Sequence, residues 1–253
     1  MIFRIAASFL LLSGIASLTY QVAWVRLLGL SMGSTSASIS TVLAAFFLGL
    51  ALGSYLAERI TRNRINSLRV YLFLEIVIGI CGLMMLPILL NLDSIVAGFP
   101  VLGSSLGMKF AVAMLLLTLP TICMGATFPV MASILVRRQS EVGLRVSQLY
   151  SLNTAGAVLG AAMAGFVFIP TWGLDGAVYI AFAINVFIVV VGFYLNRNIA
   201  LPPLEADFVV GGNDSVNSRL GDRTELLLRL LSLADIPDDT CEIALIIQKP
   251  GRQ

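Results

Sequence analysis

The stretch that decides the fold is Gln148–Gly173, QLYSLNTAGAVLGAAMAGFVFIPTWG, which contains no charged side chain. It is longer than the roughly 20 apolar residues that a helix needs to cross the hydrocarbon core of a membrane. Small residues recur along it at intervals of four, so that they share one face of a helix. In lipid, such faces let two helix backbones approach closely. The stretch therefore predicts a membrane-spanning helix at the packed centre of a helical bundle.

The composition of the whole chain agrees with this prediction. Of its 253 residues, 58% are hydrophobic and 12% are charged, and the mean hydropathy is +0.95. A soluble domain carries about twice that share of charged residues. The sequence contains no histidine, and its 3 cysteines form neither a disulfide framework nor a metal-binding spacing. We therefore expect an integral membrane protein with no metal and no cofactor.

Six apolar segments predict six membrane-spanning helices, which form an all-α bundle over residues 1–199. The segments cover residues 4–28, 38–57, 70–92, 109–136, 148–173 and 177–195. Between the first two we expect a Gly/Ser/Thr-rich turn over residues 31–38, and residues 93–108 are expected to form a loop. The fourth segment contains Pro120 and Pro129. Because proline removes a backbone donor, we expect a kinked or interrupted helix there.

Residues 200–253 form a polar, acidic tail that follows the apolar part of the chain. They contain 5 basic and 9 acidic residues, and the change begins at Leu201-Pro202-Pro203. Residues 222–231 are expected to form a short amphipathic helix, and residues 241–247 a strand. Two such elements are too few for an independent core, so we expect this tail to dock on a partner or on the membrane surface.

The arginines predict the orientation of the bundle. Cytoplasmic loops are enriched in Lys and Arg. The connections after the second and fourth segments are basic, whereas residues 29–37, 93–108 and 171–176 contain neither residue. We therefore expect both termini in the cytoplasm and the tail with them. The residues that carry this prediction are Arg59, Arg62, Arg64, Arg137 and Arg138.

Stripes of small residues predict where the helices pack. In the second segment, Gly49 and Gly53 are four residues apart. This pattern is common by chance in apolar helices, so we expect packing within the bundle rather than a dimer. The stretch Gln148–Gly173 carries two further stripes. One consists of Gly156, Gly160 and Ala164, and the other of Asn153, Ala157, Ala161 and Gly165.

A few polar side chains interrupt the apolar segments, and two interpretations stay open for them. Tyr20, Gln21 and Trp24 either anchor the first segment at the membrane surface or line the mouth of a cavity. Glu75 either faces protein or water within the bundle or lies near the headgroups, because Arg69 is only about a turn and a half away. Asn185 is expected to form an interhelical hydrogen bond.

Four motifs of this sequence resemble, in the same order, motifs of a known family. They are SGIASLTYQVAWVR (13–26), FFLGLALGS (46–54), PTICMGATFP (120–129) and YSLNTAGAVLG (150–160). They resemble the membrane domain of bacterial spermidine synthase-like membrane proteins. The resemblance implies a fold related to half of a major facilitator, a place in the bacterial inner membrane, and a fused cytoplasmic aminopropyltransferase-like domain.

The tail departs from that family. The family's catalytic domain has a Gly-rich nucleotide-binding unit and acidic substrate-binding residues, and residues 200–253 contain no such unit. We therefore expect the chain to be the membrane half without the enzyme. A separate aminopropyltransferase-like chain would then supply the activity. The sequence also offers no nucleophile–base pair, so we do not expect an enzyme.

Two functions follow as hypotheses. In the first, the bundle binds or moves a small molecule, with a cationic amine as the candidate because Glu75 and the neighbouring aromatic rings can receive a positive charge. In the second, the chain is an accessory or scaffold subunit with no ligand of its own. Its partners would be membrane lipid and either another protein or a second copy of itself, and not nucleic acid. The candidate ligand-binding residues are Tyr20, Gln21, Trp24, Glu75, Pro120, Thr121, Asn153 and Thr154.

Overall fold

The structure is a computed structural model that describes residues 2–62, 67–98, 105–135 and 142–198. Almost all of these residues are helical, and none of them is in a strand. The predicted all-α helical bundle is therefore confirmed. Three of the topology arginines, Arg64, Arg137 and Arg138, lie outside the described residues, as does the side chain of Arg62. The whole tail, with its predicted helix and strand, also lies outside them.

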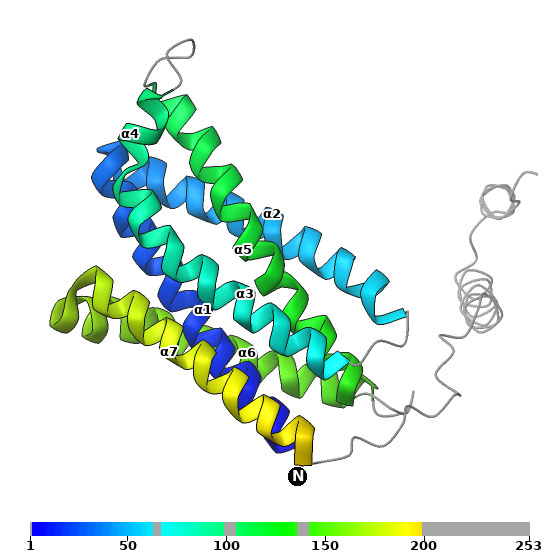
Figure 1. The fold of residues 1–253 in the computed structure, drawn as a ribbon. Helices are drawn as coiled ribbons and strands as arrows, with labels where there is room; N and C mark the ends of the chain where they lie inside the picture. The colour runs from blue at the N-terminus through cyan, green and yellow to red at the C-terminus, as the bar shows by residue number, and fades with distance from the viewer. Residues whose placement is uncertain (1, 63–66, 99–104, 136–141, 199–253) are drawn as a thin grey trace, which may run out of the picture. The chain divides into compact units, whose positions relative to one another are not determined.

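The helices follow one another along the chain and are drawn in Figure 1. Five helical stretches are long and apolar enough to cross a membrane, and the last of them, Gly143–Arg197, contains 55 residues. A straight helix of that length would measure roughly 80 Å, far more than the roughly 30 Å of hydrocarbon core. The elements are α1 (Ile2–Met32), α2 (Thr35–Arg62), α3 (Ser67–Leu90), α4 (Leu92–Ala97), α5 (Leu106–Leu135), α6 (Val142–Met163), the π-helical turn η2 (Ala164–Phe168) and α7 (Ile169–Asn198).

A break at Gly173 divides the last stretch into two. Its φ of 72° and ψ of −176° are not helical, and positive φ is a conformation that glycine adopts without the steric cost of a side chain. The chain runs along α6, reverses near this residue and returns as α7 (Figure 1). The five stretches therefore form six segments of membrane-crossing length, as predicted.

The first helix, and not the stretch Gln148–Gly173, lies at the centre of the bundle. Helix α1 packs against α2, α3, α5, α6 and α7, whereas α6 packs mainly against α1. In the most apolar window of α1, 61% of the residues are buried, whereas the buried residues of Gln148–Gly173 are Leu149, Gly156, Gly160 and Ala164. Our prediction of a packed centre at Gln148–Gly173 is therefore wrong. Its small residues serve one face only, and its other face exposes large apolar side chains such as Val158 and Phe166.

Small residues make the contact between α1 and α6 close. A Cβ atom added at Gly156 would lie 2.1 Å from the carbonyl oxygen of Leu11, and one added at Gly160 would lie 2.3 Å from that of Ile15. Ala164 is fully buried. Backbone contact with the central helix thus bears out the predicted packing role of Gly156 and Gly160, and Ala164 is buried in line with them.

The turn between α1 and α2 is shorter than predicted. It consists of Gly33 and Ser34, because α1 continues to Met32 and α2 begins at Thr35. Gly33 has a φ of 64°, and its N–H donates to the carbonyl of Gly29 over 3.1 Å, as is typical of a glycine that ends a helix. The hydroxyl of Ser34 accepts from the N–H of Ala37 over 3.4 Å and so caps α2.

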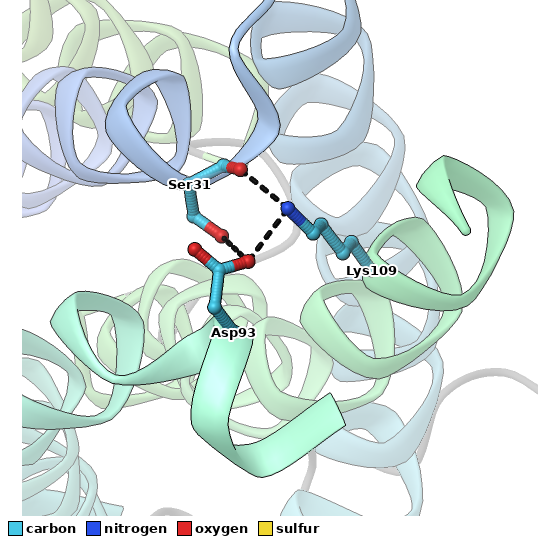
Figure 2. Close-up of polar contacts among 3 residues, drawn as sticks. All are labelled: Ser31, Asp93 and Lys109. Carbon is cyan, nitrogen blue, oxygen red and sulfur yellow. Dashed lines mark hydrogen bonds and ion pairs between the residues drawn. The ribbon is translucent and has the colours of Figure 1, made fainter. Parts of the chain in front are cut away.

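Helix α4 lies where a loop was predicted, and an ion pair ties it to its neighbours. Lys109 Nζ lies 2.6 Å from Asp93 Oδ1 and donates to the carbonyl of Ser31 over 2.6 Å. The hydroxyl of Ser31 donates to the same carboxylate oxygen over 3.1 Å. Figure 2 shows these contacts joining the ends of α1, α4 and α5. The hydrogen bond from Lys109 lowers the pKa of the Asp93 carboxyl below its ordinary value.

Helices α2 and α5 pack backbone against backbone. A Cβ atom added at Gly49 would lie 2.1 Å from Thr121 Oγ1, and one added at Gly53 would lie 2.1 Å from the carbonyl oxygen of Ile122. The reverse contact is equally close, because a Cβ atom at Gly125 would lie 2.6 Å from the Cα atom of Leu50. The predicted packing role of Gly49 and Gly53 within the bundle is confirmed.

Helix α5 continues through both of its prolines, so of the two predicted alternatives, a kink and an interruption, the interruption does not occur. Proline at position 129 cannot donate to the carbonyl of Gly125 four residues earlier. The hydroxyl of Ser54, from α2, donates to that carbonyl instead over 3.2 Å. A side chain of the neighbouring helix thus supplies the donor that Pro129 lacks, and α5 crosses this position as one helix.

Candidate functional site

Glu75 is buried in the middle part of the bundle. It is the ninth residue of α3, which begins at Ser67, and therefore lies roughly 12 Å along the helix from its start. Its exposed fraction is 0%. Of the two interpretations left open by the sequence, the structure supports a position that faces protein.

An amide side chain joins Glu75 to the central helix. Asn185, on α7, donates from Nδ2 to Glu75 Oε2 over 2.6 Å. The hydroxyl of Tyr20, on α1, donates to Asn185 Oδ1 over 3.2 Å. The two hydrogen bonds link α1, α7 and α3 through buried side chains, so the prediction that Asn185 forms an interhelical hydrogen bond is confirmed.

Three buried polar atoms near this link have no hydrogen bond of good geometry among the described residues. They are Glu75 Oε1, Tyr71 Oη and Trp24 Nε1. Tyr71 precedes Glu75 by one helical turn, and its side chain and that of Ser13 lie close to the carboxyl group. Buried polar groups are nearly always paired, and the hydroxyls of Tyr71 and Ser13 are donors for the carboxyl group beside them.

Two stacked aromatic side chains of α1 extend the cluster beyond Asn185. The rings of Tyr20 and Trp24 are stacked with their centroids 5.7 Å apart, and both residues are fully buried. A Cβ atom added at Gly82 would lie 2.4 Å from the ring of Tyr20, and one added at Gly79 would lie 3.3 Å from Cβ of Asn185. The glycines of α3 therefore give the partners of Glu75 the space that they occupy. The alternative of a surface anchor does not hold for Tyr20 and Trp24, because both rings are inside the bundle.

Among the described residues, no basic side chain balances the charge of the carboxyl group. The described groups that act on Glu75 are Ser13, Tyr71, Asn185 and Tyr20, and none of them is cationic. A bare carboxylate in a lipid-embedded interior is unfavourable by several kcal/mol, at about 2.5–3.5 kcal/mol on the insertion scale. The arrangement therefore requires either a proton or an external cation on Glu75.

The other predicted site residues lie elsewhere. The hydroxyl of Thr121 lies within hydrogen-bond distance of carbonyl groups of α2 and α5, including that of Ala45 at 3.1 Å, and Pro120 precedes it on α5. On α6, Asn153 is half-buried and Thr154 is exposed. Gln21 is buried on α1. The structure thus brings together Tyr20, Trp24 and Glu75, and it does not assign Pro120, Thr121, Asn153 or Thr154 to the same place.

Sequence reasoning missed two members of the cluster, Tyr71 and Ser13, and did not identify the partner of a third, Asn185. Spacing could have identified Tyr71, because it lies four residues before Glu75 and so on the same helix face. Ser13 carried no such signal, because its proximity to Glu75 depends on how α1 packs on α3. Asn185 was expected to bond between helices, but its partner was not predictable.

Comparisons of the chain with protein-family models, curated proteins and solved structures found no match. The described residues also contain no group of three or more His, Cys, Asp and Glu side chains that could hold a metal ion. The interpretation of the site therefore depends on its own geometry and charge.

Proposed function

We propose that the helical unit binds a small cationic molecule at the buried carboxyl group of Glu75. The observation that carries this proposal is that the carboxyl group of Glu75 is fully buried and that none of the described groups acting on it is a basic side chain. A cation would supply the opposite charge that a buried carboxylate needs. The setting for this function is a bacterial inner membrane, with both termini of the bundle in the cytoplasm.

The position of Glu75 deep in the bundle favours a protein that carries its ligand across the membrane. Ionisable residues within membrane segments often mark substrate or ion pathways, and α1, α3 and α7 all contribute to the cluster. The alternative function, an accessory subunit without a ligand, gives no reason for an ionisable group at this depth. The resemblance to spermidine synthase-like membrane proteins is the second support for an amine.

The test is amine binding by the purified full-length chain in detergent micelles, measured by isothermal titration calorimetry with methylammonium and with spermidine. We expect saturable binding of at least one, weakened at least about tenfold in Glu75→Gln because the charge pair is lost. The matched control is Glu58→Gln, which alters an exposed carboxylate on α2 and should leave binding unchanged. If neither amine binds, or if both variants behave alike, an accessory role becomes the better explanation.

A further inference from the structure

Three arginines from three helices lie at the end of the bundle where the central helix begins. They are Arg4 on α1, Arg145 on α6 and Arg197 on α7. We propose that they bind the headgroup of an anionic phospholipid at the starts of α1 and α6 and the end of α7. This lipid site is separate from Glu75 and goes beyond the proposed function.

A contact between an aromatic ring and a guanidinium group brings the first two arginines together. The Cζ atom of Arg145 lies 5.5 Å from the centroid of the Phe3 ring, and Phe3 is the neighbour of Arg4 in the sequence. Further along both helices, Gly156 lies against the backbone of Leu11. Helices α1 and α6 therefore run in the same direction, and both begin at this end of the bundle.

Helix α7 brings the third arginine to the same end. The hydrogen bond between Tyr20 and Asn185 sets the register of α1 and α7. From this bond, α1 runs back over 16 residues to Arg4, roughly 24 Å, and α7 runs on over 12 residues to Arg197, roughly 18 Å. The two helices pack against each other, and the start of α1 lies beside the end of α7 (Figure 1).

The spacing of charged residues places this end at the level of the lipid phosphates. Arg4 and Arg26 are 22 residues apart on α1, and Asp175 and Arg197 are 22 residues apart on α7. Each uncharged interval spans roughly 33 Å, against roughly 30 Å of hydrocarbon core. Arg4 and Arg197, both exposed, therefore lie just beyond the hydrocarbon, where the headgroups begin.

The charge at this end favours an anion. Among the described acids, Asp93 bonds to the opposite end of α1, Asp175 is near the opposite end of α7, Glu75 is midway along the bundle, and Glu58 is on α2. Glu141 lies outside the described residues, and the three arginines outnumber it. Guanidinium groups bind phosphate through paired N–H donors, and basic pockets between membrane helices recognise anionic headgroups.

The test is native mass spectrometry of the purified full-length chain from micelles that contain equal amounts of dioleoyl phosphatidylglycerol and dioleoyl phosphatidylcholine. The two lipids share their acyl chains and their phosphate group, but choline neutralises the charge of the second. We expect the chain to retain phosphatidylglycerol at least about tenfold more often than phosphatidylcholine. Excess inorganic phosphate should not displace the lipid, because it has no acyl chains to bury.

Four variants separate a site from a general attraction to the membrane surface. Arg4→Gln, Arg145→Gln and Arg197→Gln should each weaken the retention of phosphatidylglycerol about fivefold, the contribution of one basic residue near an anionic surface. Phe3→Leu keeps the net charge and removes the ring below Arg145. It should weaken retention about two- to fivefold, because the guanidinium group loses its cation–π contact. The matched control is Arg59→Gln, which removes a charge from the end of α2 and should leave retention unchanged.

Equal retention of the two lipids would overturn the proposal and would make the acidic tail, residues 200–253, the better candidate to cover the arginines. An effect of Arg59→Gln as large as those of the other arginines, or none for Phe3→Leu, would overturn it in favour of a general attraction to the membrane. Displacement by inorganic phosphate would overturn it in favour of a free anion. Circular dichroism establishes which variants are folded, and Phe3→Leu decides if a glutamine variant is not.

Discussion

At the scale of single residues, Glu75 shows how a neighbour on another helix changes the meaning of a side chain. Its distance from Arg69 along the helix was compatible with a position near the headgroups. The hydrogen bond from Asn185, 110 residues further along the chain, together with complete burial, places the carboxyl group inside the bundle. A carboxyl group there is a functional candidate by default, because it is unfavourable unless something neutralises it.

Outside the membrane-spanning segments, the pair of Asp93 and Lys109 predicts a dependence of stability on pH. The pKa of Asp93 is lowered in the folded chain by the hydrogen bond from Lys109, while an unfolded Asp has a pKa of about 3.9. The stabilisation is therefore present above about pH 4 and is lost as the pH falls through the lowered folded value. Because Asp93 is 62% exposed, we expect at most about 1 kcal/mol.

The measurement compares the free energy of unfolding of the unaltered chain with that of Asp93→Asn in mixed micelles. The difference should be constant from about pH 5 to pH 8 and should shrink below about pH 4. High salt should reduce it, because exposed charges are screened. Asp175→Asn, which alters an exposed acid on α7 with no ion pair among the described residues, should show no such profile. A difference that grows on acidification would contradict the prediction.

At the scale of elements, the contact between α2 and α5 explains how a helix with two internal prolines stays continuous. The glycines of both helices bring their backbones together, and this proximity lets Ser54 reach the carbonyl of Gly125. Without a proline at position 129 that carbonyl would accept from its own helix. The serine is thus useful only because the proline is present.

This dependence predicts a specific pattern of stability. Ser54→Ala should lower the free energy of unfolding by about 0.6 kcal/mol, and by up to about 1.7 kcal/mol, the range measured for hydrogen bonds between membrane helices. In a Pro129→Ala background the same substitution should have less effect, because the new N–H of residue 129 can donate to Gly125. Measuring the free energy of unfolding of the single and double variants in detergent gives the coupling free energy between residues 54 and 129.

The control for this cycle is Ser40→Ala, which removes an exposed hydroxyl from α2 and should be close to neutral. Equal effects of Ser54→Ala in the two backgrounds would show that the serine does not replace the proline's missing donor.

At the scale of the whole molecule, α1 organises the bundle. It contacts the other long helices and carries Ser13, Tyr20 and Trp24 on its length. The sequence predicted a central position for Gln148–Gly173 because its small residues, spaced by four, let helix backbones approach closely. The structure shows that small residues indicate a close contact but not a central position: α6 uses them on one face against α1, and its opposite face is free for lipid.

The orientation of the bundle is a further prediction at this scale. Thr35 and Arg59 are exposed near opposite ends of α2, and the 24 residues that separate them span roughly 36 Å of helix, more than the hydrocarbon core. In a background free of cysteine, Arg59→Cys should react with a membrane-impermeant maleimide in inside-out vesicles, and Thr35→Cys in right-side-out vesicles. The expectation follows from the excess of arginine in cytoplasmic loops.

Lysed vesicles serve as the control, because both cysteines should then react. Labelling of Arg59→Cys from the outside would reverse the orientation, and the proposed cytoplasmic position of both termini would fall with it.

The sequence by itself determined that the chain is an all-α membrane bundle, because six apolar stretches of crossing length have no other way to satisfy their backbone groups in lipid. It also determined which faces are small enough for close packing, since spacing along a helix sets which side chains share a face. The tertiary structure alone decided that α1 is central, that Ser54 compensates for Pro129, and that Glu75 joins Asn185, Tyr20, Tyr71 and Ser13. Those contacts join residues far apart in the chain, and periodicity within one helix carries no information about the partner that its face will meet.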